Sequence, residues 1–84
     1  MDLTKNPNCY TYHIVHMHPS LSKLYYSDTI TFNAMLKIVE STVMKVKNTP
    51  ARARFIRALI SCSNKRDIFN LCHNAIERGK NYQG

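Results

Sequence analysis

The spacing of apolar residues in the last two thirds of the chain predicts three consecutive helices. From residue 29 onward, apolar side chains recur at intervals of three and four, which places them on one face of an α-helix. The recurrence is interrupted at residues 48–49 and 63–64, where the residue types are those that commonly begin a helix. We therefore expect helices over residues 29–47, 50–62 and 65–78.

The residues between these segments supply the expected helix ends. Residues 27–28 and 63–64 offer N-caps, because their short polar side chains can accept a hydrogen bond from a free backbone N–H. Thr49 offers another, and Pro50 then occupies the first helical position, where its missing N–H needs no partner. Gly79 lies at the end of the third segment, which is typical of a C-terminal residue in the left-handed conformation.

The N-terminal third follows a different pattern. From Tyr10 to Met17 the side chains alternate between the two sides expected of a strand, and their aromatic and β-branched content favours that structure. Pro19 would end the strand. The apolar stretch over residues 21–26 could pair with it as a hairpin or run extended over the helices.

The length of 84 residues allows one hydrophobic core, and an apolar content of 44% is enough to fill it. The predicted fold class is mainly α, with a short N-terminal strand or hairpin followed by a three-helix domain. We expect a single small domain over residues 1–84. It divides into an extended or hairpin segment at 1–27, a helical core at 28–79 and a tail at 80–84.

The positive charge of the chain is concentrated on the second expected helix and its two flanks. The formal net charge is +7, and seven basic residues without any acidic one lie between positions 45 and 66. They are Lys45, Lys47, Arg52, Arg54, Arg57, Lys65 and Arg66. Phosphate backbones attract such a segment by counterion release, and arginine adds forked hydrogen bonds. We therefore predict that these seven residues bind nucleic acid.

The expected function is non-catalytic, sequence-tolerant binding of RNA or DNA. RNA is favoured over DNA, and double-stranded RNA is a plausible target, because contacts to phosphates and 2′-hydroxyls need few base-specific groups. The small size and the frequency of Asn, Lys, Ile and Tyr would suit a viral accessory protein.

The alternative is a protein-interaction module or an obligate dimer whose basic face docks on an acidic protein partner. A homodimer is expected because Met35, Ile38 and Val46 widen the apolar stripe of the first helix. A single small core would leave part of such a stripe uncovered.

Neither catalysis nor a cofactor is expected. The carboxylates are scattered along the chain rather than paired, and no glycine-rich phosphate-binding loop is present. Cys9, His13, His16 and His18 are candidate zinc ligands by residue type. On a strand, however, His13 would point away from His16 and His18, so no metal site is predicted, and whether this set ever binds metal stays open.

The expected location is cytoplasmic, nuclear or both. Three cysteines without a CxxC pair favour a reducing compartment over a disulfide framework. The first residues lack the apolar stretch of a signal peptide, and no apolar run approaches membrane-spanning length. We therefore expect no membrane association.

Overall fold

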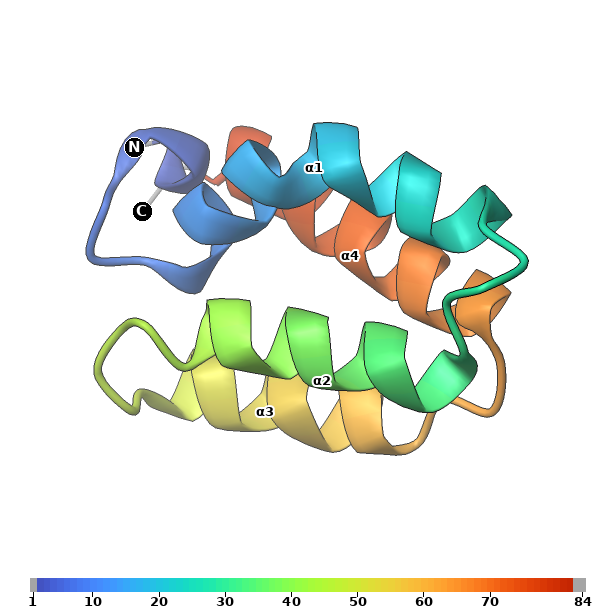
Figure 1. Ribbon diagram of the computed structural model, residues 1–84. Coiled ribbons are helices and arrows are strands. Elements are labelled where there is room, and N and C mark those ends of the chain that lie inside the picture. The colour runs from blue at the N-terminus through green and yellow to red at the C-terminus, as the bar shows by residue number, and fades with distance from the viewer. Residues whose placement is uncertain (1, 83–84) are drawn as a thin grey trace.

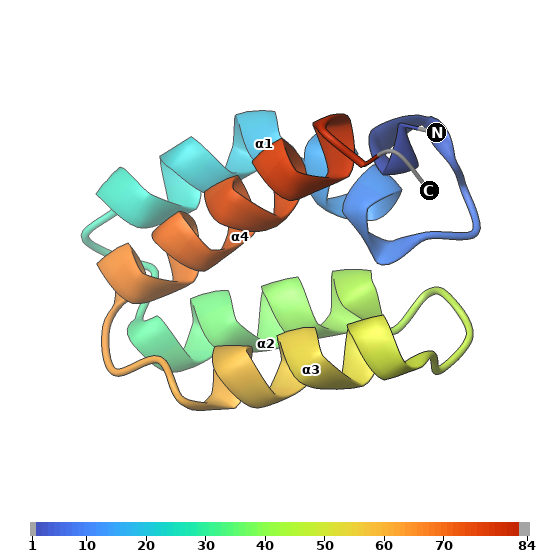
Figure 2. The same cartoon turned by 180° about the vertical axis from the view of Figure 1, so that it is seen from behind.

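The computed structural model describes residues 2–82, in which four helices follow a short 3₁₀ turn. These elements are η1 (Leu3–Lys5), α1 (Tyr10–Tyr26), α2 (Phe32–Val43), α3 (Pro50–Ile60) and α4 (Lys65–Lys80). Consecutive helices run in opposite directions, with α1 and α4 in one layer and α2 and α3 in the other (Figure 1). The view from behind shows the same two layers (Figure 2).

The mainly helical class is confirmed, but the N-terminal strand or hairpin expected within residues 1–27 is wrong, because residues 10–26 form α1. The helical pattern in this segment extends further than the alternating one. Its apolar residues at intervals of four and three are Tyr10, Ile14, Met17, Leu21 and Leu24. Ile14 and Leu21 are fully buried, and the other three pack against the core. Packing along the whole segment therefore favours a helix.

Pro19 lies inside α1 and does not end it, contrary to the expectation from sequence. A proline in a helix interior removes one backbone hydrogen bond and crowds the preceding turn. Ile14 and Leu21 are buried on either side of it, and their burial holds the helix together across this position.

Replacing this proline tests whether the segment is a helix. Pro19→Ala is expected to raise the free energy of unfolding by about 1–2 kcal/mol, because alanine restores the missing N–H and is the best helix former. Urea unfolding followed by circular dichroism measures this change. Pro50→Ala is the matched control and should have little effect, since Pro50 is the first residue of α3. No increase for Pro19→Ala over the control would contradict the helical assignment.

The three later helices are confirmed, and two of the three expected N-caps are correct. Thr49 Oγ1 accepts a hydrogen bond from the Arg52 backbone N–H at 3.2 Å. Asn64 Oδ1 accepts one from the N–H of Asp67 at 2.9 Å. At α2, Thr31 caps the helix instead of residues 27–28, so that α2 starts three residues later than expected.

Gly79 does not turn left-handed, and α4 continues through it to Lys80. The glycine is buried, and a Cβ atom there would lie 3.2 Å from Cγ2 of Thr4 and 3.3 Å from Cγ2 of Thr11. The absent side chain therefore lets α4 approach α1 and η1 closely. Thr11 also donates a hydrogen bond to the Leu3 carbonyl at 3.0 Å, which fastens η1 to α1.

The core lies where the four helices meet. Its buried apolar residues are Ile14, Leu21, Met35, Val39, Val43, Phe55, Leu59, Ile68, Cys72, Ala75 and Ile76. Met35, which was expected to widen the apolar stripe of a dimer surface, is fully buried in this core. Val46 is half-buried, and Ile38 is 38% exposed to solvent. Of the three residues expected to drive dimerisation, only Ile38 is exposed.

Candidate nucleic-acid interface

The helix α3 presents its charged side to solvent, as the sequence predicts. Phe55 and Leu59 are buried against the core, whereas Arg54 and Arg57 are exposed on the opposite side. The two arginines are three residues apart, so they are neighbours on the helix surface. Neither forms an ion pair within residues 2–82. The positive charge on this face is therefore not neutralised by the described part of the chain.

The structure separates the seven predicted basic residues into two groups. Five are exposed and make no ion pair within the described segment: Lys45, Lys47, Arg54, Arg57 and Arg66. The other two, Arg52 and Lys65, are half-buried and hydrogen-bond to backbone carbonyls. We call the first group the exposed basic stripe.

Lys65 is the first residue of α4 and holds the connection between α1 and α2. Its Nζ donates hydrogen bonds to the carbonyl oxygens of Leu24 at 3.3 Å, Ser27 at 2.6 Å and Ile30 at 2.9 Å. An ammonium group has three N–H donors, and these three carbonyls use all of them. Lys65 therefore stabilises the fold and has no proton left for a phosphate.

Arg52 has a corresponding role at the opposite end of α3. Its Nη1 donates a hydrogen bond to the Val46 carbonyl, within the loop that joins α2 to α3. Its Nε is buried and has no hydrogen-bond partner among the residues that the structure describes. Since Lys45 and Lys47 lie in the same loop, Arg52 positions them rather than adding an exposed charge of its own.

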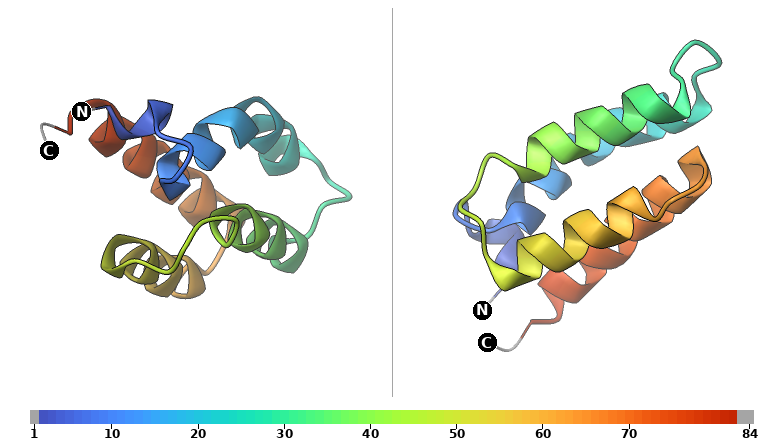
Figure 3. Two further views of the ribbon diagram at one scale, coloured as in Figure 1. Left: turned by 90° about the vertical axis from the view of Figure 1, so that its left-hand side faces the viewer. Right: turned by 90° about the horizontal axis from the view of Figure 1, so that it is seen from below.

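The exposed basic stripe is long and does not converge on one point. The loop that carries Lys45 and Lys47 precedes the N-terminal end of α3, and Arg66 follows the loop at its other end. Figure 3 shows these two loops at opposite ends of α3. The eleven residues of α3 between these groups span about 16 Å. Charges distributed over this distance suit a polymer that carries regularly repeated phosphates better than a single small anion.

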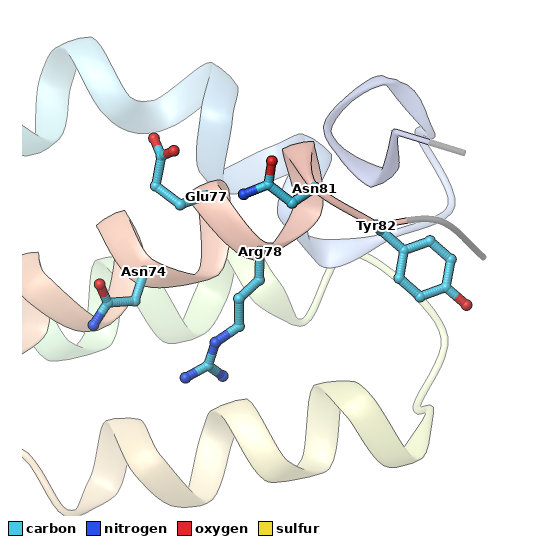
Figure 4. A pocket seen from close by; sticks show the side chains of 5 residues that line it. All are labelled: Asn74, Glu77, Arg78, Asn81 and Tyr82. Carbon is cyan, nitrogen blue, oxygen red and sulfur yellow. The ribbon is translucent and has the colours of Figure 1, made fainter.

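Arg78 on α4 is not among the seven residues predicted from sequence, but it adds to the positive field near α3. The ring of Tyr10 packs on Phe55 of α3, with 5.0 Å between the ring centroids. Burial raises the pKa of the Tyr10 hydroxyl, while the positive charges of Arg78 and Arg54 act in the opposite direction. Figure 4 shows the Arg78 side chain directed from α4 toward α3. Its place on the polar side of residues 65–78 is the sequence signal that could have identified it.

His13, His16 and His18 lie on α1 and Cys9 is its N-cap, so the strand argument used against a zinc site does not apply. His13 Nε2 lies 3.1 Å from the Pro7 carbonyl, and the ring of His16 packs against Tyr12. Across residues 2–82, no group of three or more His, Cys, Asp or Glu side chains is arranged to hold a metal ion.

The three cysteines have free thiols. Cys72 is buried in the core, and this burial raises its pKa to about 12. Burial also raises the pKa of Cys62. The Cys72 thiol therefore stays protonated at neutral pH, where it packs as a small apolar group.

Comparison of the chain with protein-family models, with curated proteins and with solved structures found no match. In the described range 2–82, no helix combines the length and the apolar character needed to cross a membrane. The chemistry of the exposed basic stripe is therefore the basis for a functional proposal.

Proposed function

We propose that this protein binds RNA or DNA without catalysis and with little sequence preference, through the exposed basic stripe on α3 and its flanking loops. One observation carries the proposal: five exposed cations lie between positions 45 and 66, and this interval contains no carboxylate side chain. Phosphates would replace the counterions that these side chains hold in solution.

The two exposed arginines on α3 strengthen this proposal. Arg54 and Arg57 repel each other at one-turn spacing, which costs the free helix a few tenths of a kcal/mol, and a bound polyanion would relieve that repulsion. Arginine also meets a phosphate with two parallel hydrogen bonds. We favour RNA over DNA, because phosphate and 2′-hydroxyl contacts together need few base-specific groups.

Titration of fluorescently labelled RNA and DNA, each single- and double-stranded, tests the proposal directly. The anisotropy change should show binding at low salt, and the affinity should fall steeply as the salt concentration rises. Several sequences of one length should bind with similar affinity. Failure of all four polymers to bind at low salt would overturn the proposal.

A protein-interaction module or homodimer is the second candidate, and the exposed apolar residues near the stripe favour it. Met44 retains 53% of its exposure beside Lys45, and Ile60 retains 63% at the end of α3. In this case the basic face would dock on an acidic protein. Light scattering would then give a dimer mass, or an acidic polypeptide would bind where nucleic acid does not.

A further inference from the structure

A shallow hollow with a mixed polar and apolar lining runs along α4 beside α3. One part of it is lined by Asn74, Glu77, Arg78, Asn81 and Tyr82, as Figure 4 shows. A second part lies between α3 and α4, and its lining includes Ala58, Ser61, Asn70 and again Asn74. Asn74 borders both parts, and we call the two together the α3–α4 hollow.

The α4 side of this hollow carries exposed side-chain amides with no hydrogen-bond partner among the residues that the structure describes. Asn70, Asn74, Arg78 and Asn81 follow one another at intervals of four, four and three, so they form one stripe on the helix. The side-chain amides of Asn70 and Asn74 make no hydrogen bond to any residue from 2 to 82. Asparagine is a weak helix former, and no internal contact compensates for it at these two positions.

The α3 side contributes positive charge. Arg54 lies one turn before Ala58, which lines the hollow, so it extends the same side of α3 toward Arg78. Both guanidinium groups lack an ion pair within the described chain.

The two carboxylates that border the hollow are already engaged. Glu77 lies 3.7 Å from Lys80 Nζ. Asp67 Oδ2 accepts hydrogen bonds from the backbone N–H and the hydroxyl of Ser63, at 3.1 Å and 3.0 Å. The hollow therefore combines Arg78, which makes no ion pair in the described chain, with amides that can both donate and accept hydrogen bonds, and Arg54 lies one turn away along α3.

We propose that the α3–α4 hollow binds a single-stranded segment of nucleic acid, with Arg54 and Arg78 on its phosphates and the amides of Asn70 and Asn74 on the edges of its bases. Unpaired bases present their Watson–Crick edges to such amides, whereas pairing in a duplex occupies those edges and, in A-form RNA, leaves the remaining edges of the major groove out of reach of side chains. The inference rests on the proposed function and goes beyond it by assigning the strand state of the ligand and a second row of contacts on α4.

The double variant Asn74→Ala with Arg78→Ala tests this assignment. We expect its affinity for a single-stranded RNA of about ten nucleotides to fall by about tenfold or more. Its affinity for a hairpin duplex of the same composition should fall less. The expected decrease is the one caused by the loss of a single phosphate contact, that of Arg78. Circular dichroism should show an unchanged or higher melting temperature, since alanine is the better helix former.

The control variant is Asn33→Ala with Lys37→Ala, which removes the same residue type and the same charge at the same four-residue spacing on α2, where both positions are exposed. An equal loss in both variants, or tighter binding of the duplex than of the single strand by the native protein, would overturn the inference while the proposed function stands. Failure of the native protein to bind any nucleic acid would overturn the proposed function itself.

Discussion

Lys65→Met is expected to lower the free energy of unfolding by about 2–4 kcal/mol, the largest stability effect of any basic residue in the chain. The ammonium of Lys65 donates to three carbonyls at the end of α1 and in the α1–α2 loop. Hydrogen bonds from a charged donor are stronger than neutral ones, and partly buried acceptors without a partner are costly. Methionine retains the aliphatic stem, so the change isolates the role of the charged group.

Urea unfolding measures this effect, and Arg66→Met is its matched control. Arg66 is the next residue in α4, carries the same charge and is exposed, so its replacement should change stability by no more than about 0.5 kcal/mol. Equal effects of the two substitutions would show that Lys65 does not hold the α1–α2 connection.

Arg54→Ala with Arg57→Ala is expected to weaken nucleic-acid binding by about 10- to 100-fold at moderate salt while leaving the fold intact. Both side chains are exposed on α3, so their loss removes two phosphate contacts without opening the core. Because phosphates carry no sequence information, the loss should be similar for different sequences. Anisotropy titration measures the affinity, and circular dichroism checks the fold.

The control for this variant is Lys23→Ala with Lys37→Ala. These lysines are exposed on α1 and α2, and their removal changes the net charge by the same amount. A local interface predicts that this pair reduces the affinity much less than the arginine pair. Equal reductions would instead indicate attraction by the net charge of the whole molecule.

The later helices could be predicted from sequence because local signals agree there. At Thr49 and Asn64, a capping residue stands where a new helical repeat of apolar residues begins, and both residues are helix N-caps in the structure. Between Tyr10 and Met17 two periods compete, since eight residues fit both alternation and a helix. Only the apolar pattern over the full length of α1, up to the buried Leu21 and beyond, distinguishes the helix from a strand. Pro19 wrongly suggests that the segment ends there, although it lies inside the helix.

The exposure of the candidate binding residues could be predicted only in part, for a related reason. The exposure of Arg54 and Arg57 follows from the helical pattern of one segment. The hydrogen bonds of Lys65 join residues that are 35 to 41 positions apart in the sequence. No local pattern could therefore show that the Lys65 ammonium binds backbone carbonyls instead of pointing to solvent. The position of Arg78 near Arg54 likewise depends on how α4 packs beside α3 and α1.

The most direct test of the central claim is the salt dependence of nucleic-acid affinity in the native protein and in the Arg54→Ala, Arg57→Ala variant. The logarithm of the association constant should fall linearly with the logarithm of salt concentration for both proteins. If both arginines contact phosphates, the slope for the variant should be shallower by about 1.4 with a single strand or about 1.8 with a DNA duplex. Identical slopes and affinities for the two proteins would contradict the claim that the exposed face of α3 binds the phosphate backbone.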